Sequence, residues 1–377
     1  MNVLYLQDHG EIGGAQLSLL DLLAGLRMAA PEIHPTVVVG KDGFLLERLQ
    51  TQHFPSEVWR FPEYRKWKHL FQRHDFMERL AEFCRTKKID VVHANTLQVA
   101  PWSAAVGARL KIKSCCTIRE VVDVRQMKKY CLFEQDQLIA ISSAVKNNLP
   151  PELLGRCRQI YNCIAPAGPP ASKEELTFRG KFPPKAPLVG FMGKISERKG
   201  IAFLIDAIPE VLQAIPTAHF LFLGTGAPDY LAKMTARLTA LNITEHVTFC
   251  GELKNGAGYL HLLDVFVLPS FTEGLGRVTV EAMFAGLPVV ATNTGGTLEI
   301  VDPDVTGRLV PPKNSGALAE QIIFYLKNGT IGKQHGAAGK KRAGKLFGLE
   351  NNARSVGKLY RALMESENGR PSRAING

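Results

Sequence analysis

Short apolar runs alternate along this chain with longer segments in which apolar residues recur every three or four positions. The runs predict buried strands, and the periodic segments predict helices. For example, Leu17, Leu20 and Leu23 recur at helical spacing after the first run. Because single helices separate the strands, we predict parallel, doubly wound α/β sheets. The expected strands are residues 2–7, 36–39, 89–92, 114–118, 137–141, 159–162, 188–192, 219–223, 247–250 and 265–268.

The length of the chain and one stretch near its middle indicate two domains. At 377 residues the chain exceeds the size at which a single core usually keeps growing. Residues 165–187 are rich in Pro, Gly, Ser and Lys, which is typical of a linker. We therefore expect a Rossmann-like domain over residues 1–165, a linker over 166–187 and a second such domain over 188–350. A central linker suits two similar domains that face each other across a cleft.

The stretch 271–283 is the strongest candidate for chemistry. It follows the apolar run 265–268, contains Gly274 and Gly276, and leads into a segment with helical periodicity. A strand, a glycine loop and a helix in this order form an anion site, because backbone N–H groups at a helix N-terminus attract a phosphate or diphosphate. Glu273 and Glu281 bracket the loop, and their carboxylates suit hydrogen bonds from sugar hydroxyls beside that phosphate.

The residues around these two glutamates resemble a known family. Glu273 and Glu281 are separated by seven residues inside the frame Glu-Gly-x-Gly followed by Glu-Ala-Met-x-Ala-Gly-x-Pro-Val-Val. This resembles the E-x7-E signature of the family-4 retaining glycosyltransferases of the GT-B fold. The spacing alone would equally suit two surface residues of a helix, but the frame favours the family.

The resemblance implies that residues 1–165 form the acceptor-side domain and residues 188–350 bind a nucleotide-sugar. It places Glu273 on hydroxyls of the transferred sugar and Glu281 on the ribose. In GT-B folds the last helix crosses back to the N-terminal domain, so the same is expected of residues 351–377.

Two further loops are expected to hold the donor diphosphate. The first contains Gly13 and Gly14 after the first strand; its glycines do not match the dinucleotide fingerprint, so an NAD site is not favoured. The second contains Lys194, Arg198 and Lys199, three cations within six residues that can neutralise a leaving phosphate. Family members commonly have Arg at the place of Lys194, and Arg198 would share its task.

The predicted site therefore has two sets of residues on the donor side. The catalytic set is Glu273, Lys199 and Lys194. The donor-binding set is Gly13, Gly14, Arg198, Gly274, Leu275, Gly276, Arg277, Val278 and Glu281.

The acceptor side is expected at the carboxyl ends of two strands in the N-terminal half. His93 and Asn95 follow one predicted strand, and Arg119 follows another; α/β folds bind ligands at such ends. Related enzymes often have His-x-His where this chain has Asn95, so His93 and Asn95 are candidate contacts of the sugar or acceptor. The alternatives are a purely structural His93, and an ion pair of Arg119 with Glu120 or Asp123.

Charge points to an anionic partner without identifying it. The net charge of +11 is spread along the chain, whereas a nucleic-acid binder concentrates its charge on one module, so no nucleic-acid partner is expected. Residues 59–79 interleave six Lys/Arg and two His with aromatic side chains. They predict either an ordinary helix with one packed face or a surface that meets an anionic membrane carrying the acceptor.

Metal, cofactor and disulfide chemistry are not indicated. Asp302-Pro303-Asp304 has the form of an Asp-x-Asp metal motif, but its proline favours a tight turn, so no metal site and no cofactor are expected. The seven cysteines are unevenly spaced and predict reduced thiols. No signal peptide or spanning segment is recognised, which predicts a cytoplasmic protein. Peripheral contact at the inner membrane face is the alternative that segment 59–79 leaves open.

Together these features predict a retaining hexosyltransferase that moves a sugar from a nucleotide-diphosphate sugar to a hydroxyl of a glycan or lipid-linked acceptor. Two alternatives share the predicted donor site. One is a GT-B nucleotide-sugar epimerase, and the other is a non-catalytic protein that binds nucleotide-sugars.

Overall fold

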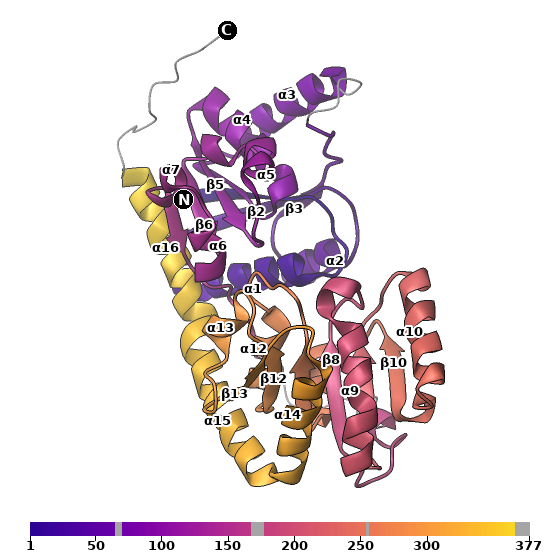
Figure 1. Cartoon of the computed structure of the whole chain (residues 1–377). Coiled ribbons are helices and arrows are strands. Elements are labelled where there is room, and N and C mark those ends of the chain that lie inside the picture. The colour runs from indigo at the N-terminus through magenta and orange to yellow at the C-terminus, as the bar shows by residue number, and fades with distance from the viewer. Residues whose placement is uncertain (65–69, 167–176, 254–255, 366–377) are drawn as a thin grey trace. The chain divides into compact units, whose positions relative to one another are not determined.

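A computed structural model describes residues 1–64, 70–166, 177–253 and 256–365 of the chain (Figure 1). The chain divides into two compact units. The first comprises residues 1–164 together with the final helix from Leu349, and the second comprises residues 165–348. Of the expected linker 166–187, residues 167–176 lie outside the described residues.

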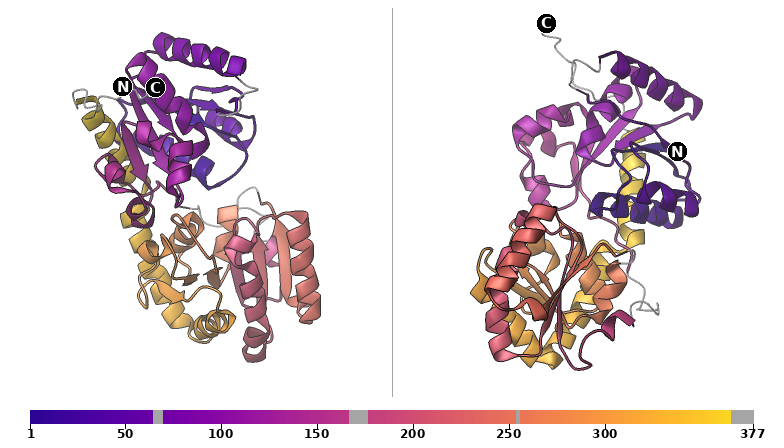
Figure 2. Two further views of the ribbon diagram at one scale, coloured as in Figure 1. Left: turned by 45° about the horizontal axis from the view of Figure 1, so that its top comes forward. Right: turned by 90° about the vertical axis from the view of Figure 1, so that its right-hand side faces the viewer.

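Within the described residues, the first unit has a parallel sheet of seven strands with helices on both faces (Figure 2). Along the sheet the strands are β3 (Ser56–Val58), β2 (His34–Val39), β1 (Asn2–Gln7), β4 (Val91–Ala94), β5 (Lys113–Ile118), β6 (Gln137–Ala140) and β7 (Cys157–Gln159). The strand order reverses direction between β1 and β4, and ligands of such sheets bind at the carboxyl ends of the strands beside this switch point. The helices of this unit are α1 (Gly14–Ala29), α2 (Phe44–Thr51), α3 (Leu70–Thr86), α4 (Ala100–Leu110), α5 (Val124–Lys129), α6 (Ser143–Asn147), α7 (Pro151–Leu154) and α16 (Leu349–Glu365).

The second unit repeats this architecture with a parallel sheet of six strands in its described part. Their order is β10 (Val247–Gly251), β9 (His219–Leu223), β8 (Leu188–Met192), β11 (Val265–Leu268), β12 (Val289–Thr292) and β13 (Gly307–Val310), so the switch point lies between β8 and β11. Its helices are α9 (Ile201–Ala214), α10 (Pro228–Ala240), α11 (Gly256–Tyr259), α12 (Arg277–Phe284), α13 (Thr297–Ile300), α14 (Ser315–Lys327) and α15 (Gly329–Phe347). Two doubly wound parallel sheets confirm the predicted α/β class.

Two predicted strands are displaced in the structure. The strand expected at residues 89–92 is β4, so it starts two residues later and includes His93. The strand expected at 159–162 is β7, which ends at Gln159. Residues 160–164 are largely apolar although they form no strand, because Cys163 and Ile164 are buried in the unit beside the sheet.

The final helix α16 belongs to the first unit, where it packs on α1. Gly25 of α1 permits this contact, because a Cβ atom there would lie 2.7 Å from the Leu349 carbonyl oxygen and 2.8 Å from the Ala353 Cβ. Val356 and Tyr360 of the same helix are part of the core that surrounds β1. The helix is therefore an integral part of this unit.

The aromatic residues of segment 59–79 lie mainly inside the first unit. Trp59 is 2% exposed and meets Phe76 edge-on at a ring distance of 6.1 Å, while the guanidinium of Arg79 lies 4.1 Å from the Trp59 ring. Phe71 is the exception, with 86% of its surface exposed. Helix α3 begins after Pro62, as expected, and residues 65–69 lie outside the described residues. Among helices within the described ranges, none is both long and apolar enough to cross a membrane.

Candidate functional site

The loop between β11 and α12 in the second unit is built by glycines. Gly276 caps the N-terminus of α12 with φ of +92°, a conformation that side-chain-bearing residues rarely adopt. Two further glycines, Gly295 and Gly296, lie against this loop. The Gly296 N–H donates to the Glu273 carbonyl oxygen at 3.0 Å. A Cβ atom at Gly295 would lie only 2.1 Å from the same oxygen. Gly295 and Gly296 therefore hold the loop in place from behind.

Two ion pairs flank the loop. Lys199, from the loop after β8, pairs with the carboxylate of Glu273, and these side chains are only 12% and 7% exposed. Arg277, the first residue of α12, donates from Nε to Glu281 Oε1 at 2.7 Å. The two predicted glutamates thus each have a cation, and the pairs stand at the carboxyl ends of β8 and β11, beside the switch point.

The other predicted donor residues of this unit lie around the same loop. Arg198 donates from Nη1 to the Thr272 carbonyl oxygen at 3.0 Å, which ties the cationic loop to the glycine loop. The side chain of Lys194 is exposed. Leu275 is 2% exposed, so only its backbone could serve a ligand, and Val278 is partly buried in the first turn of α12.

The predicted glycine loop of the first unit leads into α1. Gly13 caps the helix with an extended backbone, and Gly14 is its first residue. The Leu17 N–H makes the first helical hydrogen bond, to the Gly13 carbonyl oxygen at 3.0 Å, which leaves the preceding N–H groups without helical partners. This end of α1 therefore has the donors that an anion needs.

His93 is buried, and both ring nitrogens lie within hydrogen-bond distance of side chains of the same unit. Its side chain is 0% exposed; Nδ1 lies 2.5 Å from the Tyr360 hydroxyl and Nε2 lies 2.7 Å from the Thr117 hydroxyl. Burial, with a smaller contribution from the charge of Arg119, lowers the pKa of His93 to about 3. The physical reason is its position, because His93 lies inside β4 and faces the core beside Tyr5.

Asn95 is also buried, at 1% exposure. Its side chain bonds within the unit: Nδ2 donates to Gln7 Oε1 at 2.5 Å and to the Ala15 carbonyl oxygen at 3.2 Å, and Oδ1 accepts from Arg119 Nη2. Arg119 also donates from Nε to the Asn95 carbonyl oxygen and from Nη1 to Asn162 Oδ1, both at 2.9 Å. Arg119 is thus bonded to two asparagines of its own unit.

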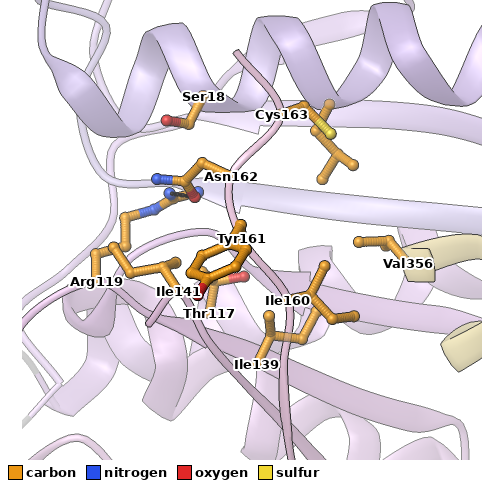
Figure 3. Close-up of a pocket in the computed structure, with 11 residues that line it drawn as sticks. Ser18, Thr117, Arg119, Ile139, Ile141, Ile160, Tyr161, Asn162, Cys163 and Val356 are labelled. Atoms are coloured by element: carbon orange, nitrogen blue, oxygen red, sulfur yellow. Dashed lines mark hydrogen bonds between the residues drawn. The ribbon is translucent and has the colours of Figure 1, made fainter. Parts of the chain in front are cut away.

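A small cavity lies beside this cluster (Figure 3). Its volume is about 20 Å³, which holds about one water molecule and no sugar ring. Arg119 and Asn162 point toward one another at its rim, and Thr117 and Ser18 are among its polar lining residues. The cavity is therefore part of the packing around Arg119 and no substrate site.

The aspartates of the Asp302-Pro303-Asp304 sequence lie in a turn, as predicted. The Thr306 N–H donates to the Asp302 carbonyl oxygen at 2.9 Å, and Asp304 has φ of +60°. Asp304 pairs with Arg308 at 3.1 Å, and Asp302 lies 4.0 Å from Arg342. Metal independence itself stays a prediction.

Both units match glycosyltransferase sequence families. Residues 12–167 match the family described as Glycosyltransferase Family 4, and residues 186–328 match the family described as Glycosyl transferases group 1. The comparisons support a glycosyltransferase of family 4. The matched ranges contain the predicted donor residues in both units.

Individual relatives agree with this assignment. An uncharacterized glycosyltransferase of Methanocaldococcus jannaschii is 28% identical over 291 residues, which are 74% of this chain and 76% of that protein. The phosphatidyl-myo-inositol mannosyltransferase of Mycobacterium leprae is 33% identical over 162 residues, 42% of each chain. The lipopolysaccharide core mannosyltransferase LpsB of Rhizobium meliloti is 27% identical over 52% of this chain and 57% of its own.

Solved structures show that the fold is GT-B. Anabaena HepE, in a complex with UDP-glucose, matches with a TM-score of 0.83 at 22% identity, over 96% of this chain and all of its own. WaaG, a glycosyltransferase involved in lipopolysaccharide biosynthesis, matches with a TM-score of 0.70 at 16% identity, over 94% of this chain and 99% of its own.

The sequence analysis missed the residues that organise the first unit. Gln7, Asn162 and Tyr360 bond to the predicted residues Asn95, Arg119 and His93, respectively. A signal existed for Gln7 and Asn162, because both are polar residues at or just beyond the end of an apolar run. None existed for Tyr360, which lies 267 residues from His93.

Proposed function

We propose that this protein is a retaining hexosyltransferase that uses a nucleotide-diphosphate sugar and transfers the sugar to a hydroxyl of a glycan or lipid-linked acceptor. The observation that carries the proposal is the pair of glutamate–cation contacts around the loop 274–276, at the carboxyl ends of β8 and β11. Glycine amides, a helix N-terminus and two carboxylates together suit a diphosphate with sugar hydroxyls on either side.

In the proposed reaction the bond between the sugar C1 and the diphosphate oxygen breaks, and a bond between C1 and the acceptor oxygen forms on the same face. The electron pair of the broken bond goes to the leaving diphosphate. Lys199, Lys194 and Arg198 neutralise that charge, together with the amides at the start of α12 and of α1. The proton of the acceptor hydroxyl goes to the leaving phosphate.

Glu273 and Glu281 take different roles in this proposal. Glu273 accepts hydrogen bonds from hydroxyls of the sugar, and Glu281 accepts them from the ribose. Neither carboxylate acts as the nucleophile of a retaining hydrolase, since the acceptor oxygen bonds directly to C1 as the diphosphate leaves. The cation beside each glutamate orients its carboxylate before a donor hydroxyl arrives.

The relatives suggest which sugars to test. Two of them are mannosyltransferases by name, and HepE was crystallised with UDP-glucose. We therefore propose a nucleotide-diphosphate hexose as the donor. A thermal-shift panel of UDP-, GDP- and ADP-sugars that includes mannose and glucose selects among the bases and sugars.

Two matched substitutions test the roles of the glutamates. Glu273→Gln should lower turnover more than it weakens binding of the free nucleoside diphosphate, because the sugar contact is absent from that ligand. Glu281→Gln should weaken nucleotide binding itself. Normal binding and normal turnover in both variants would refute the proposed site, and conversion of the sugar nucleotide to its epimer, without release or transfer of the sugar, would favour an epimerase.

A further inference from the structure

The carboxyl ends of β1, β4 and β5 are joined by one chain of buried hydrogen bonds. We infer that Asn95 and Arg119 are positioning residues that hold the first turn of α1, including the Gly13–Gly14 loop, rather than contacts of the acceptor. The inference rests on the proposed function insofar as that loop binds the donor diphosphate. The claim that Asn95 and Arg119 stabilise the first turn of α1 does not depend on any ligand.

Asn95 uses both of its side-chain donors within the unit. An asparagine side chain offers two N–H donors and one oxygen with two lone pairs. In the structure the donors go to Gln7 Oε1 and the Ala15 carbonyl oxygen, and the oxygen accepts from Arg119. With 1% of Asn95 exposed, its contacts are internal, and one of them is to the second residue of α1.

Arg119 fixes Asn95 from the other side. Its Nε and Nη2 atoms donate to the carbonyl oxygen and the side-chain oxygen of Asn95, and Nη1 donates to Asn162 Oδ1. The guanidinium fork suits such simultaneous bonds, which a lysine could not reproduce. Asn162 is in turn held by α16, since Asn352 Nδ2 donates to the Asn162 carbonyl oxygen at 3.1 Å. Figure 3 shows Arg119 and Asn162 meeting below α1.

The chain continues to the end of β1. Gln7, which accepts from Asn95, donates from Nε2 to Asp8 Oδ1 at 2.5 Å. Thr96 donates to the same carboxylate oxygen at 3.1 Å. Hydrogen bonds therefore connect the ends of β1 and β4 to each other and to α1. A substitution of Arg119 should affect the start of α1 through Asn95.

Amide hydrogen exchange tests the placement of α1 directly. In Arg119→Lys and in Asn95→Ala, exchange of the first helically bonded amides of α1, those of Leu17 and the residues of the next turn, should accelerate on the order of fivefold, the equivalent of one neutral hydrogen bond. Tyr360→Phe is the matched control, because it removes a buried hydroxyl that bonds Tyr5 and His93 but none of this chain. Exchange of these amides that is unchanged in Arg119→Lys, or equally fast in Tyr360→Phe, would overturn the inference.

Hydrolysis of UDP-glucose, or of the hexose nucleotide that the thermal-shift panel selects, tests the consequence without an acceptor. If Arg119 positions the diphosphate loop, Arg119→Lys lowers kcat of this acceptor-free reaction by about tenfold with a smaller change in KM. If Arg119 instead contacts the acceptor, hydrolysis keeps its parental rate and the inference is wrong. A parent that neither binds nor hydrolyses any donor refutes the proposed function, and the exchange experiment still decides on Asn95 and Arg119.

Discussion

At the scale of single residues, Lys199 and Glu273 form the contact that matters most. Both side chains are largely buried, so each charge depends on the other for compensation. Breaking a buried pair from one side leaves an uncompensated charge, which costs more than the pair contributes. A substitution of Lys199 therefore affects stability as well as binding, and the two effects need separate measurements.

We predict that Lys199→Ala weakens binding of a nucleoside diphosphate by about 1.5–3 kcal/mol, the range for a hydrogen bond to a charged group. It should also lower the free energy of unfolding on the order of 3 kcal/mol, because Glu273 loses its cation. Titration calorimetry and denaturant unfolding measure the two quantities.

The double variant Lys199→Ala with Glu273→Gln is the control for Lys199. It should regain most of the stability, since no buried charge remains, and it should still bind the nucleotide weakly. Parental affinity in the single variant would remove Lys199 from the site.

His93 gives the first unit a dependence on pH. Its pKa of about 3 in the folded protein lies below its ordinary value of 6.5, so between these values the unfolded chain binds more protons. The free energy of unfolding should therefore fall as the pH is lowered from 6.5 toward 3, by at most about 1.4 kcal/mol per pH unit from this residue. Above pH 6.5 this contribution is fully present.

His93→Gln isolates the contribution, because glutamine keeps an amide near Thr117 and does not titrate. Denaturant unfolding at steps from pH 6.5 to 4.5 should show a shallower slope in the variant than in the parent. Equal slopes would mean that His93 is protonated in the folded protein.

At the scale of elements, the glycine pair behind the loop is as important as the loop itself. Gly295→Ala should displace the backbone at Glu273, because its new Cβ would meet the Glu273 carbonyl oxygen at 2.1 Å. We expect turnover to fall by about tenfold or more, as misplacement of a positioned group does. Steady-state kinetics with the selected donor measure this.

Gly286→Ala is the matched control for Gly295. Gly286 also has positive φ, at +80°, but a Cβ there meets nothing within 4 Å. Both substitutions carry the conformational cost of a left-handed residue. Equal activity of the two variants would show that the close approach at Gly295 does not matter for the loop.

Most strands were readable from the sequence for local reasons, although β3, β12 and β13 were not among those predicted. An apolar run before Gly193 marked β8, and an apolar run before Pro269 and a glycine loop marked β11 and the start of α12. The burial of Asn95 was not readable. Its partners Gln7 and Arg119 come from separate strands, and only the parallel sheet brings their ends together.

Segment 59–79 makes a prediction at this scale too. Among the described aromatic residues of this segment, Trp59 and Phe76 are packed inside the unit and Phe71 is exposed, so the test concerns the cations. Replacing Arg65, Lys66, Lys68 and Arg73 with Ser should reduce sedimentation with anionic liposomes and make the residual binding less sensitive to salt, since each cation contributes on the order of 1 kcal/mol.

Binding of the soluble donor serves as the control for that fourfold variant and should not change. A parent protein that ignores anionic liposomes at low salt would make the segment an ordinary solvated helix. The acceptor would then be a soluble glycan or small molecule.

At the scale of the whole molecule, two units of the same architecture each have a glycine loop at the start of a helix. In the second unit cations and glutamates surround loop 274–276, and in the first the Gly13–Gly14 loop leads into α1. The chain returns to its first unit through α16, so its C-terminal residues support the strand ends near its N-terminus. The packing of the final helix on the first unit was predicted only from the resemblance to the family, because the sequence of an amphipathic helix does not show which element it packs on.

The stereochemistry of acceptor-free hydrolysis, followed by proton NMR in the presence of a chelator, is the most direct measurement. The parent protein with the selected nucleotide hexose should first release the sugar with the anomeric configuration that it had in the donor. Activity should survive the chelator, because Lys199, Lys194 and Arg198 supply the positive charge. First release of the opposite anomer, or activity that chelator abolishes and magnesium or manganese restores, would contradict a retaining, metal-independent glycosyltransferase.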